Sequence, residues 1–393
     1  SRSEIVENEY NLNIPRYVKS LESEVPHDVE AHLLGGIPAE NIKSLKTLHE
    51  LVPEVFDESI EEIRPGYFKL NKSLQEMTEQ LLNHSKVISL ASNLETEITQ
   101  YVSKFWNGLR NVTQDVNLVE IEERMLLEVK QILFRYGHID IYAGYQIVAE
   151  IWKKSLLRDI ELIASEGFYN VGRMREPKYV MKGTGKNRRE EQDGWIGVLV
   201  QNELVAKLLY SEELKRLEDK RNNIQNIELE LADLVERAKV EDSEENEALS
   251  DVIQKNGDDE LGDSFDKKAL KSELGKAKKG TFKHSMLLKV EGLIVESASL
   301  SKELKDEEKE LWEAVQERIL TLSNDEVDML VFEKWFGNTV NEIVSLIYAS
   351  LKNELNILKK IDERYSDTLD EIDNQIERLL VEFELLKNDL VVE

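Results

Sequence analysis

The sequence predicts a mainly α-helical protein, in which a helical domain is followed by long antiparallel, coiled-coil-like helices. A small β-hairpin or loop insertion is predicted near residues 170 to 200. Proline, which interrupts helices, occurs six times and never after Pro177, so the rest of the chain can form long uninterrupted helices. Apolar residues also recur at helical spacing through most of the chain, whereas glycines crowd into one short segment.

The first half divides into a tail and a domain. Residues 1 to 25 contain Pro15 and little periodicity, so we expect an extended tail there. Residues 26 to 167 alternate apolar-periodic segments with turn signals, which predicts a compact helical domain. Its longer helices are expected at about residues 70 to 107, 117 to 136 and 139 to 165. The expected core aromatic residues are Trp106, Phe134, Tyr142, Tyr145 and Trp152.

Residues 168 to 200 interrupt the helical pattern. Glycines surround two short β-prone runs, at residues 179 to 181 and 195 to 200, which predicts a Gly-rich basic hairpin or loop. Residues 201 to 393 return to a helical pattern, with a flexible loop or a short frayed helix expected at 256 to 280. Residues 323 to 326 read Ser-Asn-Asp-Glu, a capping box that predicts the start of the last helix.

That last helix contains the most regular apolar stripe in the chain. A 3.5-residue repeat runs from Leu351 to Leu390 and is apolar at every position but Asp362, and Ser366-Asp-Thr could break the helix once. Such a repeat faces another helix, either within this chain at residues 202 to 240 or 282 to 322, or in a partner. The predicted partner-binding residues are Leu351, Leu355, Leu358, Tyr365, Leu369, Ile372, Ile376, Leu379, Phe383 and Leu386.

The overall charge limits contact with nucleic acid. The net charge of −28 repels DNA and anionic membranes, so any DNA contact must be local. A local candidate is the predicted hairpin, where glycines would let the backbone approach phosphates. The candidate DNA-backbone residues are Arg173, Arg175, Lys182, Lys186, Arg188 and Arg189. The same residues also fit a solvated loop that offsets neighbouring acids.

A second basic cluster lies in the expected loop and is interpreted as solvated surface. Its members are Lys267, Lys268, Lys271, Lys276, Lys278 and Lys279. The sequence has no cysteine, no apolar run of membrane-spanning length and no secretory leader, so we expect a cytoplasmic protein. We expect no metal site and no catalytic centre, because no known ligand or nucleophile spacing is met.

Five segments carry a family resemblance. They are EYNLNIPRYV at 9 to 18, DVEAHLLGGIP at 28 to 38, IDIYAGY at 139 to 145, GWIGVLVQNEL at 194 to 204 and LSNDEVDMLV at 322 to 331. In this order they resemble the long version of the modification (M) subunit of type I restriction-modification systems, whose methyltransferase domain precedes the first segment. The resemblance implies that this chain is the C-terminal part of an N-6 adenine-specific DNA methyltransferase subunit.

The catalytic motifs of that family do not occur in this chain. The sequence has no Asn-Pro or Pro-Pro pair to grip a flipped adenine, and Gly183-Thr-Gly185 does not lead into an apolar helix. We therefore expect no cofactor in this fragment, with S-adenosylmethionine bound by the catalytic domain. The resemblance implies a specificity subunit as partner, a restriction subunit in the full complex, and DNA contacted through that complex. The alternative is a free-standing helical scaffold that self-associates through its coiled coil.

Overall fold

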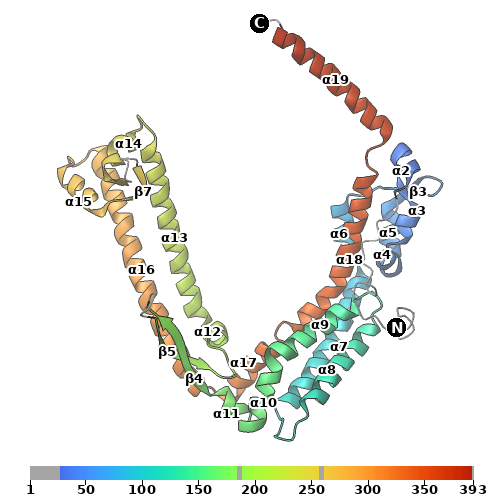
Figure 1. Ribbon diagram of the computed structural model, residues 1–393, viewed down its shortest axis with the longest axis horizontal. Coiled ribbons are helices and arrows are strands. Elements are labelled where there is room, and N and C mark those ends of the chain that lie inside the picture. The colour runs from blue at the N-terminus through green and yellow to red at the C-terminus, as the bar shows by residue number, and fades with distance from the viewer. Residues whose placement is uncertain (1–26, 184–187, 256–260, 392–393) are drawn as a thin grey trace. The chain divides into compact units, whose positions relative to one another are not determined.

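The computed structural model describes residues 27 to 183, 188 to 255 and 261 to 391, so the tail predicted at residues 1 to 25 lies outside the described residues. The protein is mainly α-helical with small antiparallel sheets, which confirms the predicted fold class. It forms two compact units (Figure 1). Unit 1 comprises residues up to 105, 117 to 154 and 338 to 393, and unit 2 comprises residues 106 to 116 and 155 to 337. The predicted segments 26 to 167 and 201 to 393 each contribute to both units.

Unit 1 combines helices with an antiparallel sheet in the strand order β1-β3-β2. Its elements are α2 (Val29–Leu34), β1 (Ile37–Pro38), α3 (Ala39–Lys43), α4 (Lys46–Leu51), α5 (Pro53–Ser59), β2 (Ile60–Arg64), β3 (Tyr67–Leu70), α6 (Leu74–Leu82), α7 (Ser85–Leu109), α8 (Leu118–Phe134), α9 (Ile141–Ile151), α18 (Thr339–Arg364) and α19 (Leu369–Val391). The last residues of α7 belong to unit 2. The long helices predicted in this region are confirmed, with the first divided into α6 and α7.

Three of the five predicted core aromatic residues of the helical domain are at the surface instead. Trp152 is buried, but Phe134, Tyr142 and Tyr145 are 74%, 77% and 36% exposed. The periodicity assigns a residue to a face of a helix only approximately, and Phe134 and Tyr142 also lie at a helix end, where the apolar face is no longer covered. A buried tyrosine that the prediction omitted, Tyr101, instead links α7 to α8 by donating to the carbonyl of Met125.

Unit 2 contains the predicted hairpin and the longest helices. Its elements are the π-helix η2 (Trp152–Leu156), which begins in unit 1, α10 (Leu157–Glu166), α11 (Phe168–Gly172), β4 (Arg175–Lys182), β5 (Arg189–Gly197), α12 (Asn202–Leu209), α13 (Ser211–Lys239), α14 (Glu244–Leu249), the 3-10 helix η4 (Ser250–Val252), β6 (Ile253–Lys255), β7 (Leu261–Phe265), α15 (Lys267–Lys276), α16 (Phe282–Leu320) and α17 (Asn324–Phe336). Strands β4 and β5 are antiparallel, so the predicted hairpin is confirmed.

Helices α13 and α16 form the antiparallel pair that the fold prediction anticipated, and Figure 1 shows them side by side. Lys220 of α13 contacts Glu307 of α16, and Glu230 further along α13 contacts Lys289. Residue numbers therefore rise along one helix as they fall along the other. The contact is closed by buried apolar residues at helical spacing, such as Leu217 and Leu234 in α13.

Two local predictions need correction. The segment expected to be a loop or a short frayed helix, 256 to 280, contains β7 and the packed helix α15 within its described part, because Leu270 and its neighbours bury apolar side chains in a local core. The expected last helix is three helices. Its capping box is confirmed, since Ser323 accepts from the amide of Glu326 and Glu326 accepts from Ser323, but the helix ends at Phe336. The second break, between α18 and α19, lies at Ser366-Asp-Thr, where the sequence allowed one.

A buried ion pair joins distant segments of unit 2. The Asp159 carboxylate of α10 is 2% exposed and accepts from the Lys334 ammonium at 2.6 Å and from the Trp335 indole at 2.8 Å. Lys334 also donates to the carbonyl of Leu199 at 2.8 Å. One carboxylate thus connects α10 to α17, and the lysine connects α17 to the end of the hairpin segment.

None of the helices in the described ranges has the length and apolar character needed to cross a lipid bilayer.

Replacing Asp159 by alanine is expected to lower the free energy of unfolding by about 3 to 5 kcal/mol, because it leaves the Lys334 ammonium buried without its counter-charge. Urea unfolding of the full chain measures this decrease. The control Glu313→Ala removes an exposed ion pair with Lys309 and is expected to cost about 0.5 kcal/mol or less. Equal decreases for the two variants would show that the buried pair has no special role.

Candidate functional site: the C-terminal helix and the basic hairpin

The predicted apolar stripe divides into a buried half and an exposed half. In α18 and the residue that ends it, the stripe residues Leu351, Leu355, Leu358 and Tyr365 are all at most 5% exposed. In α19, by contrast, every side chain that the structure describes is exposed. The exposed stripe residues are Leu369, Ile372, Ile376, Leu379, Phe383 and Leu386. Among the described residues, the stripe is therefore buried along α18 and exposed along α19.

The buried half is covered within unit 1 by α4, α6 and α9, none of which we predicted as its partner. Beside it, the Glu354 carboxylate accepts from the backbone amides of Thr47 and Leu48, both at 2.9 Å. These amides lie in the first turn of α4, which has no side-chain cap of its own. Glu354 therefore caps the start of α4, although it is distant in the sequence. A carboxylate at the start of a helix also interacts favourably with the helix dipole.

The linker between α18 and α19 lies against α2. The Tyr365 hydroxyl accepts from the Asp28 amide at 3.2 Å, and its ring is 4.9 Å from the ring of His32. Gly35, which ends α2 with a φ of 77°, approaches Thr368 so closely that a Cβ there would lie 3.1 Å from the threonine methyl group. The buried stripe thus ends at a point that α2 fixes.

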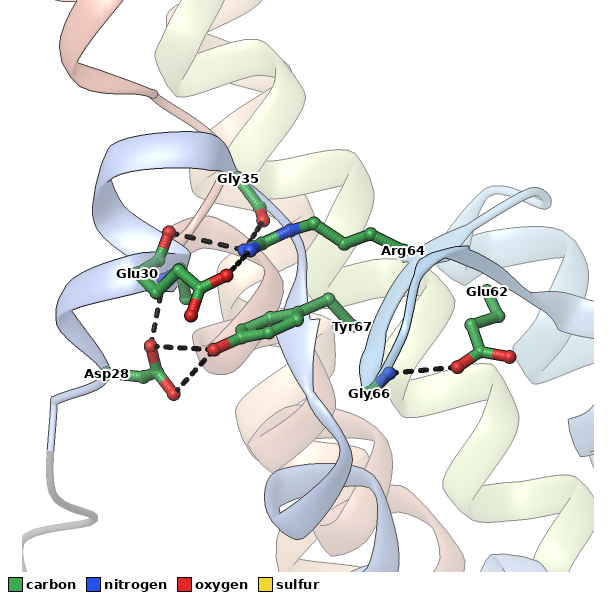
Figure 2. Close-up of polar contacts among 8 residues, drawn as sticks. Asp28, Glu30, Gly35, Glu62, Arg64, Gly66 and Tyr67 are labelled. Atoms are coloured by element: carbon green, nitrogen blue, oxygen red, sulfur yellow. Dashed lines mark hydrogen bonds and ion pairs between the residues drawn. The ribbon is translucent and has the colours of Figure 1, made fainter.

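A polar cluster fixes α2 in turn (Figure 2). The Arg64 guanidinium of β2 lies 3.5 Å from the centre of the Tyr67 ring, pairs with Glu30 and donates to the carbonyl of Gly35 at 2.7 Å. The Tyr67 hydroxyl donates to the Asp28 carboxylate at 3.2 Å. Both ends of α2 are therefore bound to the β2-β3 hairpin, which holds the base of α19 in place.

Helix α19 begins at this fixed base with a cap of its own. Thr368 accepts from the amide of Glu371, and the Glu371 carboxylate accepts from the amide and hydroxyl of Thr368. At about 1.5 Å per residue, the 23 residues of α19 extend about 35 Å. Leu380, Val381 and Leu385 are exposed as well, but by helical spacing Val381 and Leu385 point away from the stripe. The 3.5-residue repeat does not include these three, although their apolar character is visible in the sequence.

A cleft of about 410 Å³ lies at the junction of α18 and α19. Asp362, the one polar position in the stripe, lines it together with Lys69, Tyr365 and Thr368. Burial raises the pKa of the Asp362 carboxyl above its ordinary value, while the charge of Lys69 lowers it and that of Glu363 raises it. The ionised carboxylate is therefore a cost to folding at neutral pH.

The two arginines nearest the start of the hairpin serve internal packing. Arg173 donates to the carbonyl of Leu322 and to the side chain of Asn324, at the start of α17. Arg175 pairs with Glu317 at 2.9 Å and lies 4.8 Å from the centre of the Trp195 ring. These contacts attach the hairpin to α16 and α17, which accounts for both side chains without a ligand.

The remaining basic residues of the hairpin are more exposed. Lys182 pairs with Asp193 at 2.9 Å, and Arg189 pairs with Glu191 at 2.5 Å. Hydrogen bonding to Asp193 raises the pKa of Lys182, so it remains charged. Arg188 is exposed and contacts no acid within the described ranges, while Lys186 lies outside them. The cations of the hairpin can contact a phosphate, but Lys182 and Arg189 must first break their ion pairs with carboxylates.

Within the described residues, no group of three or more His, Cys, Asp or Glu side chains is arranged to hold a metal ion. Comparisons of the chain with protein-family models, with curated proteins and with solved structures found no match.

Replacing Asp362 by asparagine is expected to raise the melting temperature at pH 7, because the variant no longer buries a charge. The wild-type chain should gain stability as the pH falls through the raised pKa of this group. The difference in melting temperature between the variant and the wild type should therefore shrink toward pH 4. Calorimetry at several pH values measures this difference. Asp373→Asn, on exposed α19, is the control and should change little. A lower melting temperature for Asp362→Asn at pH 7 would contradict the assignment.

Proposed function

We propose that this chain is the non-catalytic assembly region of a type I restriction-modification DNA adenine methyltransferase subunit, and that α19 binds the specificity subunit. The observation that carries the proposal is the exposure of every described side chain on α19, set against the burial of the same stripe in α18. A row of exposed apolar side chains along one face of a helix is typical of an interaction site. The resemblance of the five segments supplies the identity of the partner.

The charge of α19 supports a different protein as partner rather than a second copy. The exposed acids Glu371, Asp373, Glu377, Glu382 and Glu384 outnumber the bases Arg378 and Lys387. Two copies of α19 would bring like charges together along the flanks of the apolar face. A helix with basic flanks is a better match. The alternative, a scaffold that self-associates through α19, has to overcome this repulsion.

The proposal assigns no catalytic step to this chain. Transfer of a methyl group from S-adenosylmethionine to adenine belongs to the catalytic domain of the family, and a restriction subunit joins the full complex. We place the assembly in the cytoplasm, because a chain without cysteine suits a reducing compartment. DNA reaches this chain through the complex, with Lys182, Lys186, Arg188 and Arg189 as the proposed contacts with the DNA backbone.

The α19 contact is tested by replacing Leu379 with glutamate, which should weaken binding to the cognate specificity subunit about thirtyfold or more. Val381→Glu is a matched control, because Leu379 and Val381 are 63% and 62% exposed but two residues on a helix point to nearly opposite sides. Calorimetric titration of the full chain measures both affinities. Equal affinity for Leu379→Glu and wild type would exclude this face as the contact.

A mass measurement in solution separates the two hypotheses. The chain alone should be monomeric at micromolar concentration and should join the specificity subunit on mixing. A stable homodimer that Leu379→Glu dissociates, and that ignores the specificity subunit, would favour the self-associating scaffold.

The hairpin contact is tested in the assembled complex by reversing Lys186, Arg188 and Arg189 to glutamate. DNA binding should weaken, and the slope of log K against log salt concentration should fall by about 0.9 for each phosphate that the variant no longer neutralises. An unchanged slope would mean that the hairpin does not touch the DNA backbone.

A further inference from the structure

The lysine-rich segment that the sequence suggested to be a solvated loop is instead a packed module of unit 2. Helix α15 lies against α16 through Leu270, which is 2% exposed and belongs to a core with Leu287 and Val290 of α16. Strand β7 and helix α14 complete this module at one end of the α13-α16 pair, as Figure 1 shows. The lysines of α15 are therefore presented by a helix with a defined orientation.

One face of α15 is basic and carries no acid. Leu270 and Leu274 face the core, so Lys268 and Lys271 face solvent. Lys278 and Lys279 follow in the exposed turn before α16. We call Lys268, Lys271, Lys278 and Lys279 the lysine surface. Among the described residues, none of these four ammonium groups has an ion pair or hydrogen bond.

Asp266 and Glu273, the acids of α15 and its cap, hydrogen-bond to other groups than the ammonium groups of the lysine surface. Asp266 accepts from the amides of Lys268 and Ala269 and so caps α15. Glu273 pairs with Lys276 and with Lys283 of α16, and these hydrogen bonds lower its pKa. Neither carboxylate forms an ion pair with the lysine surface. The predicted hairpin patch differs, because Lys182 and Arg189 there already have acidic partners.

We propose that the lysine surface binds the phosphate backbone of a duplex nucleic acid. Exposed lysines on a helix and its adjoining turn can reach successive phosphates, because each ammonium group ends a long flexible stem. The net charge of −28 does not prevent this contact, since charges more than about 8 Å away are largely screened at physiological salt. The inference concerns this chain alone and does not rest on its proposed role in a methyltransferase.

The packing of α15 favours nucleic acid over a lipid surface. A membrane-binding amphipathic helix inserts an apolar face beside its basic face. The apolar side of α15, with Leu270, Leu274 and Ala277, is instead packed in the core of the module. Phosphates that approach the lysine surface need no apolar insertion, and contact of this kind carries no base specificity.

The test measures binding of the full chain to labelled 30-base-pair duplexes, one of DNA and one of RNA, by fluorescence anisotropy at increasing salt. The variant Lys268→Glu/Lys271→Glu should weaken binding at least about tenfold and lower the salt slope by up to about 1.8, at about 0.9 per phosphate contact. The neutral variant Lys268→Gln/Lys271→Gln should show the same direction with a smaller decrease in affinity.

The control is Lys302→Glu/Lys305→Glu on α16. It makes the same charge change at two exposed lysines, but these lie beside acids such as Glu303 and Asp306. The proposal is supported if the α15 variant weakens binding to either duplex while the control leaves that affinity within about twofold of wild type. Comparison of the two duplexes shows which nucleic acid is preferred. Equal decreases in duplex affinity for the two variants would overturn the proposal. So would a wild-type chain that binds neither duplex, or one that binds only to anionic phosphatidylserine vesicles.

Discussion

Burial of the apolar face of α18 is the constraint on which the arrangement of unit 1 depends. This face can leave water only by contacting α4, α6 and α9, which lie far away in the sequence. The same packing brings Glu354 to the uncapped start of α4 and Tyr365 to the start of α2. The beginning and the end of unit 1 are therefore held together by one helix, and the departure point of α19 follows from it.

The two halves of the stripe illustrate how one sequence pattern leads to opposite outcomes. Leu358 and Leu379 occupy equivalent positions in the repeat, yet Leu358 is fully buried and Leu379 is mostly exposed. The difference arises because α4, α6 and α9 pack against α18, whereas none of the three has comparable contact with α19. Burial of the apolar face of α19 against a partner would stabilise the complex, as burial of the apolar face of α18 stabilises the chain itself.

Charge is organised differently in the two basic segments of unit 2. In the hairpin, cations are neutralised locally, as Arg175 is by Glu317 and Lys182 by Asp193. In α15, the acids are used for capping and for pairs on the α16 side, which leaves Lys268 and Lys271 without acidic partners among the described residues. Sequence composition ranked the hairpin first as a site for phosphates. Lys182 and Arg189 must break an ion pair before they can contact a phosphate, whereas Lys268 and Lys271 need not.

The sequence by itself determined the helical class, the antiparallel hairpin after residue 168, the capping box at Ser323 and the apolar repeat, because each depends on the spacing of nearby residues. Only the tertiary structure decided which half of the repeat is covered, that Glu354 caps α4, that Asp159 holds Lys334 and Trp335, and that the lysine-rich segment folds as α15. These features join residues that are distant in the sequence or depend on a shared core. Burial of a residue depends on which distant residues pack against it, and the spacing of nearby residues does not specify those contacts.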